Sequence, residues 1–115
     1  MTTDAMNSRH DNPADAIDAM VERLVAQFDP EQIVLFGSHA RGTAGPDSDV
    51  DLLVIMPFSG SKRAKQFELR MAVYDVDVPK DILLVSPDEV ATNRDIPGTL
   101  IQPALQEGQV VYARR

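Results

Sequence analysis

The sequence predicts a mixed α/β domain of the α+β kind, in which helices pack mainly on one face of a small mixed β-sheet. Three features lead to this expectation. Apolar residues recur with helical spacing in some segments, short runs rich in Val, Ile and Leu lie between them, and Gly or Pro separates most of the segments. A chain of 115 residues has the length of one such domain.

The first expected element is a helix that follows a disordered, polar tail over residues 1–11. Asn12 and Pro13 form a suitable helix start, because Asn caps free N–H groups and Pro fits the first turn. The helix is expected to end at Asp29-Pro30. Its apolar face consists of Ile17, Met20, Val21, Leu24, Val25 and Phe28.

Two strands flank a loop in the next part of the chain. Residues 32–36 form the first β-rich run, which ends at Gly37-Ser38. Residues 39–48 contain two glycines and a proline, so we expect mostly loop, with a helical turn after Ser38. Residues 49–56, with the sequence DVDLLVIM, are the strongest strand candidate.

The second half of the chain alternates helices and strands. We expect a helix over 62–74, a strand over 80–85 and a short helix over about 86–94, which opens with the capping-box sequence SPDE. A last helix over 99–107 and a strand over 109–112 complete the order. Helical spacing of Ala64, Phe67, Met71 and Tyr74 marks the helix at 62–74. We interpret Phe67, Met71 and Tyr74 as core residues rather than as a nucleobase pocket.

Composition excludes several classes of function. The chain has no Cys, which excludes thiolate metal sites and Cys nucleophiles, and its two His are too few for a multi-histidine zinc centre. Its net charge of −7 opposes non-specific nucleic-acid binding, which needs a basic surface. No apolar run approaches the roughly 20 residues that span a bilayer, and the polar N-terminus does not resemble a signal peptide. We therefore expect a cytoplasmic protein with no membrane partner.

Two carboxylates lie on one face of the strongest strand candidate. Asp49 and Asp51 are two residues apart, so their side chains point to the same side of a strand. Like charges this close require a positive partner, and Mg²⁺ prefers oxygen ligands. Asp81 completes a cluster of three acids if the second and third strands are neighbours, with Asp77 as the competing third acid. A solvated strand end is the alternative interpretation.

A Gly-Ser turn follows the first strand. Gly37 permits close approach of the backbone to a ligand, and Ser38 supplies a hydroxyl and a backbone N–H to a phosphate. Arg41, three residues later, can add positive charge to the same anion. The glycine spacing and the missing lysine exclude a Walker A loop. A plain turn with a surface arginine is the alternative.

The spacing between these two features carries a family resemblance. Gly37-Ser38, ten further residues and Asp49-Val50-Asp51 form the pattern GSx10DxD. The stretch GSHARGTAGPDSDVDLLVI resembles the minimal nucleotidyltransferases of the DNA polymerase β superfamily. The resemblance runs from the helix before QIVLFGS to the closing EGQVVY, about residues 13–112. It assigns residues 12–115 to a nucleotidyltransferase domain with a polymerase β-like core.

The resemblance implies a magnesium-dependent reaction in which a nucleoside monophosphate passes to a hydroxyl and pyrophosphate is released. Asp49 and Asp51 would hold two magnesium ions that bridge the triphosphate. Asp81 would be the third metal-binding and catalytic carboxylate and would help to deprotonate the acceptor.

The resemblance also assigns residues to the nucleotide donor, for which ATP is expected. Gly37 and Ser38 would cradle the β- and γ-phosphates. Arg41 and Ser48 would be further contacts of the triphosphate. His39 is expected to face solvent.

A partner protein is a further implication. The nucleotidyltransferase core accounts for the chain, so we expect recognition of the acceptor to come from another subunit. Minimal members of this group are often antitoxins of HEPN-domain toxins and transfer AMP to a tyrosine of the toxin. Two alternatives stay open: a non-catalytic antitoxin that acts by occlusion, and a transferase for a small molecule or an RNA end that assembles as a homo-oligomer. A homodimer of the chain is also open.

Overall fold

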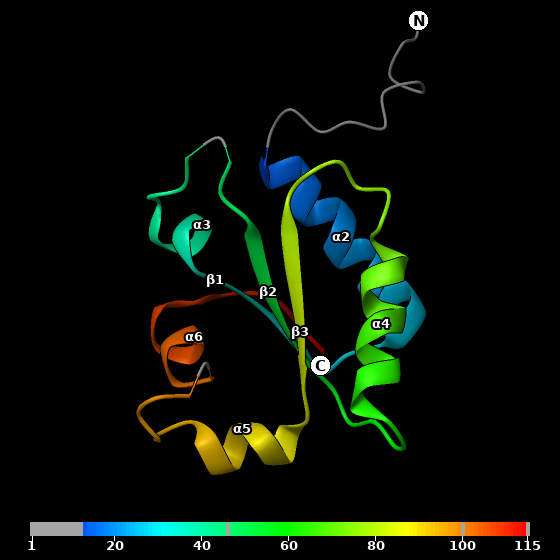
Figure 1. Cartoon of the computed structure of the whole chain (residues 1–115), viewed down its shortest axis with the longest axis vertical. Coiled ribbons are helices and arrows are strands. Elements are labelled where there is room, and N and C mark those ends of the chain that lie inside the picture. Colours follow the sequence, from blue (N-terminus) through cyan, green and yellow to red (C-terminus); the bar gives the residue numbers. More distant parts are fainter. Residues whose placement is uncertain (1–12, 46, 100, 115) are drawn as a thin grey trace, which may run out of the picture.

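The structure, a computed structural model, describes residues 13–45, 47–99 and 101–114. The tail expected over 1–11 and the helix start at Asn12 lie outside these ranges. The elements follow the expected order (Figure 1). They are α2 (Pro13–Phe28), β1 (Gln32–Phe36), α3 (Ser38–Arg41), β2 (Val50–Ile55), α4 (Lys62–Ala72), β3 (Lys80–Val85), α5 (Pro87–Asn93), α6 (Ile101–Glu107) and β4 (Gln109–Ala113).

Most predicted bounds agree with the observed ones, and a capping box opens α5 as expected. Four elements, β2, α4, α5 and α6, are one or two residues shorter than predicted at an end, and the differences in β2 and α4 concern residues discussed below. The strand expected over 49–56 spans Val50–Ile55, so Asp49 immediately precedes it. Helix α4 ends at Ala72 and not at Tyr74. None of the helices within the described ranges is long and apolar enough to cross a membrane.

Four strands form one mixed sheet in the order β3-β2-β1-β4. Strand β1 runs antiparallel to β2 and β4, whereas β2 and β3 are parallel. The register pairs Asp51 with Phe36 on one side and with Asp81 on the other. The predicted mixed α/β class is confirmed, and β2 and β3 are neighbours, as the predicted acid cluster requires.

The two faces of the sheet carry cores of different size. Helices α2 and α4 cover the face with the larger core, and α5 and α6 cover part of the other (Figure 1). Leu52 packs into the larger core and Leu53 into the smaller one, because strand side chains alternate. By the same alternation Asp51 and Asp81 begin the face of the smaller core. They lie near the start of their strands, remote from α5, which follows the far end of β3.

The interpretation of Phe67, Met71 and Tyr74 as core residues is wrong, because all three are exposed. The side of α4 that faces the sheet is instead formed by Leu69, with Val73 at its C-cap. The helix therefore has apolar residues on two opposite sides. Helical spacing alone fits either side as the buried one, and only the position of α4 against α2 and β3 decides between them.

Candidate active site

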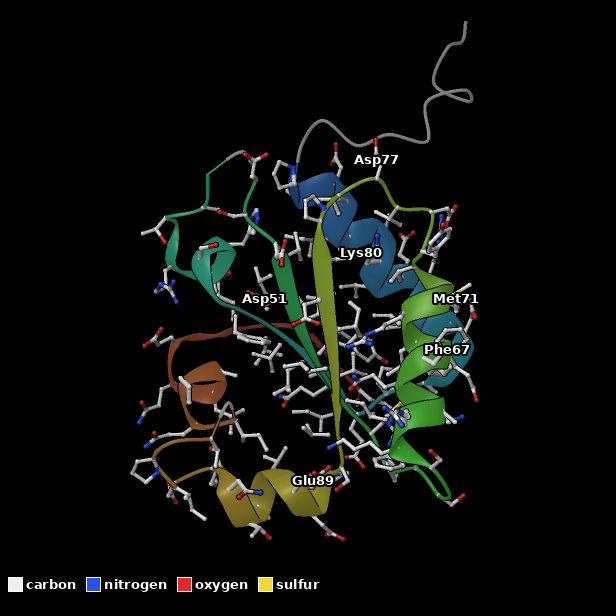
Figure 2. The ribbon with its side chains drawn as sticks, in the orientation of Figure 1. Asp51, Phe67, Met71, Asp77, Lys80 and Glu89 are labelled. Atoms are coloured by element: carbon white, nitrogen blue, oxygen red, sulfur yellow. The ribbon has the colours of Figure 1, made fainter. Side chains whose placement is uncertain are left out.

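The paired strands bring two of the predicted acids together. Asp51 and Asp81 are direct partners in the parallel β2–β3 pairing, on the same face of the sheet. Asp49 is exposed and lies two residues before Asp51, just outside the strand. Asp77 is exposed in the segment before β3, apart from Asp51 (Figure 2). The structure thus places Asp81, and not Asp77, beside the Asp-x-Asp pair.

The charges of Asp49 and Asp81 act on Asp51. Burial, and then the negative charges of Asp81 and Asp49, raise the pKa of Asp51 above its ordinary value. His39 and Arg41 oppose this rise. A cluster of carboxylates that repel one another fits a divalent cation, which would remove the repulsion.

The acids do not form a closed cage. Across the residues that the structure describes, no three acidic or histidine side chains are placed closely enough to surround one ion. Asp81 also has a cationic neighbour, since Oδ1 of Asp81 lies 3.8 Å from Nη2 of Arg70 on α4. This arrangement fits Mg²⁺, which usually keeps several waters and uses one or two carboxylates together with substrate phosphates.

Gly37 is required by both its backbone and its surroundings. It has φ 76° and ψ −157°, a conformation that is almost confined to glycine. A methyl group on its Cα would overlap the Asp51 carboxylate. The turn after β1 therefore packs directly against the central acid of the cluster, which brings together the two parts of the GSx10DxD pattern.

Ser38 begins α3 directly after this turn and is half-buried. Its hydroxyl has no hydrogen-bond partner among the described residues. The carbonyl of Gly37 accepts the N–H groups of Ala40 and Arg41 at 3.1 Å each, which fixes the short helix. Within the described residues, the Ser38 side chain therefore has no structural bond that it would need to break to contact a ligand.

His39 joins α3 to the loop that precedes β2. Its Nε2 lies 3.2 Å from the carbonyl oxygen of Ser48, and because a carbonyl only accepts, Nε2 carries the proton of this bond. The Ser48 hydroxyl accepts the N–H of Gly45 at 2.9 Å. His39 is half-buried rather than facing solvent as expected, and its bond holds the residue before Asp49.

Replacing His39 by alanine is expected to loosen this loop without unfolding the protein. Loss of one neutral hydrogen bond lowers the free energy of unfolding by about 1 kcal/mol. The N–H of Ser48, which donates to the carbonyl of Gly45 at 3.2 Å, should exchange faster with solvent in the variant. Hydrogen exchange measured by NMR checks this, and an unchanged rate at Ser48 would contradict the structural role of His39.

Arg41 lies between the acid cluster and α6. Its Nη1 is 3.4 Å from Oε1 of Glu107 in an exposed ion pair, which contributes little to stability. Its positive charge nevertheless acts on Asp51, where it partly offsets the rise in pKa caused by burial and by the other two acids. The guanidinium therefore lies near the site while it is held by a weak surface contact.

These features agree with a comparison of the whole sequence with known protein families. The family profile of the nucleotidyltransferase domain matches residues 17–96, which include every candidate site residue. The chain belongs to this nucleotidyltransferase family. A comparison of this nucleotidyltransferase with the sequences of curated proteins finds no significant match.

Solved structures share the fold of this nucleotidyltransferase at low sequence identity. A chain of a toxin–antitoxin complex with AMP-PNP is 22% identical, with a TM-score of 0.60, 85% of our chain covered and 74% of that chain. A chain of a variant MntA–HpeT toxin–antitoxin complex is 21% identical with a TM-score of 0.61, and the match covers 86% of our chain and 73% of that chain. A third similar chain comes from a complex between a tri-AMPylated HEPN toxin of Shewanella oneidensis and an MNT antitoxin. It is 17% identical with a TM-score of 0.58, and the match covers 90% of our chain and 74% of that chain.

Two contacts near the site were not predicted from the sequence. Arg70 was not predicted to contact an acid, because it reaches Asp81 only through the packing of α4 beside the edge strand β3. The bond from His39 to Ser48 spans nine residues and depends on how the loop folds back. Neither contact has a signal in local spacing.

Proposed function

We propose that this nucleotidyltransferase transfers AMP from ATP to a hydroxyl group of a partner protein, with two magnesium ions shared among Asp49, Asp51 and Asp81. The observation that carries the proposal is the register of β2 and β3, in which Asp51 lies beside Asp81 and packs against the Gly37 turn. In a nucleotidyltransferase this arrangement suits a triphosphate whose phosphates face both the turn and the acids.

In the proposed reaction the acceptor oxygen attacks the α-phosphorus of ATP. The new bond joins the acceptor oxygen to phosphorus, the bond to the bridging oxygen of the β-phosphate breaks, and pyrophosphate leaves. Asp81 receives the hydroxyl proton. Bound magnesium would supply neutralisation of the charge on the phosphates.

The remaining residues of the site position the donor. Gly37 and Ser38 would contact the β- and γ-phosphates, and Arg41 would contribute positive charge once it leaves Glu107. The Ser48 hydroxyl oxygen accepts the N–H of Gly45, so we propose that Ser48 holds its loop in place. The hydroxyl hydrogen of Ser48 would at the same time donate to the triphosphate.

The acceptor that we propose is a tyrosine of a HEPN-domain toxin, which makes the chain an antitoxin. Support comes from the similar structures, which are complexes of toxins with antitoxins and include a tri-AMPylated HEPN toxin and an AMP-PNP complex. Occlusion of the toxin without transfer is the alternative, and the ion pair between Arg70 and Asp81 would be compatible with an inactive site.

The test is transfer of label from ATP labelled at the α-phosphate, in the presence of Mg²⁺, to a lysate of the source cell and to the co-expressed HEPN partner. We expect one labelled protein, and no label with EDTA or with the double variant Asp49→Asn, Asp51→Asn. Asp77→Asn is the matched control, because it removes a nearby exposed acid that lies outside the cluster. Full neutralisation of the toxin by the double variant, with no label in any reaction, would favour occlusion.

A further inference from the structure

Helix α4 exposes a line of large apolar side chains. Phe67 is 61% exposed, Met71 49% and Tyr74 72%. Their spacing places them along one side of the helix axis, continued by the turn after it, and Figure 2 shows Phe67 and Met71 on the outer side of α4. The other large exposed apolar residues in the described ranges lie singly, Ile96 between α5 and α6 and Val110 on β4. The line on α4 is thus the main concentration of exposed apolar surface in those ranges.

Grooves follow this line on both sides. One, of about 510 Å³, runs between α4 and the end of α2, where Phe28, Phe67 and Met71 line it. Another, of about 260 Å³, lies between α4 and the approach to β3, where Tyr74 and Pro79 line it together with Arg70. Protruding rings beside grooves provide the shape that a protein interface needs at its centre.

The charge of α4 itself is opposite to that of the protein as a whole, although Lys62, Lys65 and Arg70 form ion pairs with Glu89, Glu68 and Asp81. The chain has a net charge of −7 and only eleven basic residues. Four of them lie on α4, which has a single acid, Glu68. Arg63 has no ion pair among the described residues. The four basic residues of the helix are Lys62, Arg63, Lys65 and Arg70.

The same surface reaches the candidate active site. Arg70 belongs to the groove beside Tyr74 and also lies 3.8 Å from Asp81. An acidic group that binds Arg70 would draw the guanidinium away from Asp81. A molecule docked on α4 would therefore lie next to the carboxylate that we propose as proton acceptor.

From these observations we infer that α4, with Phe67, Met71 and Tyr74 at its centre and its basic residues as a rim, is the surface on which the acceptor protein docks. The matching partner surface has an apolar centre and a rim of Asp and Glu. The identity of the docked protein as acceptor, and therefore the choice of a HEPN protein as the binding probe, rests on the proposed function, whereas the location of the docking surface rests on α4 alone.

Two other occupants fit the surface less well. A second copy of the chain, packed by two-fold symmetry through α4, would place the basic rim of one helix against that of the other. An RNA strand would have to approach a protein of net charge −7 beside an acid cluster, although the basic rim would attract its phosphates. Both remain as outcomes of the experiment.

The experiment measures binding of the purified chain to the co-expressed HEPN partner by calorimetry, with label transfer from ATP followed in parallel. The double variant Phe67→Ser, Tyr74→Ser is expected to weaken binding at least about 30-fold, because exposed aromatic residues dominate interface affinity. The matched control, Ile96→Ser with Val110→Ser, removes similarly exposed apolar groups elsewhere and should bind normally. Unchanged circular dichroism spectra and melting temperatures exclude misfolding.

Charge reversal tests the rim separately. Arg63→Glu is expected to weaken binding about tenfold at low salt and less at high salt, whereas the control Arg94→Glu at the C-cap of α5 should have little effect. Normal binding by both α4 variants overturns the inference, as does wild-type protein that binds no partner. Dissociation of a wild-type dimer by the Phe67 and Tyr74 changes, or loss of co-purifying RNA with Arg63→Glu, assigns the surface to those occupants instead.

The two proposals fail in different ways. If the complex forms and depends on α4 but no label is transferred, the proposed function fails and the docking surface stands. If label is transferred equally by the wild type and by both α4 variants, the docking surface fails and the proposed function stands.

Discussion

Asp51→Asn is expected to reduce nucleotide transfer at least about 100-fold and, in the same protein, to raise its melting temperature in EDTA at pH 7. The loss of transfer follows because the central acid of the proposed metal site no longer carries a charge. The gain in stability follows because Asp51 is half-buried and is repelled by Asp81 and Asp49. Activity and stability therefore change in opposite directions at one residue.

The pH dependence of this gain has a definite sign. Burial and repulsion raise the pKa of Asp51 in the folded protein above its ordinary value of 3.8. Below that ordinary pKa the side chain is neutral in both states and the fold has no penalty from it. As the pH rises through the folded-state pKa, the fold loses stability through ionisation. The advantage of Asp51→Asn should thus be present at pH 7 and should disappear near pH 3.

Thermal unfolding at several pH values checks this, and added Mg²⁺ supplies a readout besides activity. The wild type should gain melting temperature with Mg²⁺ in the absence of nucleotide, whereas Asp51→Asn should gain much less. Asp77→Asn makes the same change of charge at an exposed position and should alter neither activity nor the response to Mg²⁺. If Asp51→Asn melted below the wild type at pH 7 in EDTA, this would contradict the repulsion of Asp51 by Asp81 and Asp49.

Gly37→Ala is expected to lower the free energy of unfolding by about 3 kcal/mol and to abolish transfer. About half of this arises from a backbone conformation that L-residues rarely adopt, and the rest from overlap with the Asp51 carboxylate. Transfer is lost because either the turn or the central acid must move. Urea unfolding and the label assay measure the two effects.

Gly42 provides the matched control for this substitution. It has nearly the same φ, 77°, but nothing lies within 4 Å of an added methyl group. Gly42→Ala should therefore lower the free energy of unfolding by only about 1 kcal/mol, the conformational part alone. In an Asp51→Ala background the penalty at Gly37 should fall to its own conformational part, about 1.5 kcal/mol. Equal penalties at Gly37 and Gly42 in the wild type would refute the close contact with Asp51.

Local sequence determined most of the secondary structure and two parts of the candidate site, the Gly37-Ser38 turn and the Asp49-Asp51 pair. The helical spacing of α2, the capping box of α5 and the short apolar runs of β1 and β3 contain their own signals, because turns, caps and side-chain periodicity act over a few residues. The spacing from Gly37-Ser38 to Asp49 and Asp51 likewise lies within one stretch of chain and identified the family.

Only the tertiary structure decided which residues meet. Asp81 and Asp77 were both open as the third acid, and the parallel register of β2 and β3 places Asp81 beside Asp51. Helix α4 has apolar residues on two sides, and packing against α2 and β3 buries Leu69 while it leaves Phe67 exposed. The physical reason is common to both cases. Strand pairing and helix docking join residues far apart in the chain, so their outcome depends on how all the elements share one core and not on any local pattern.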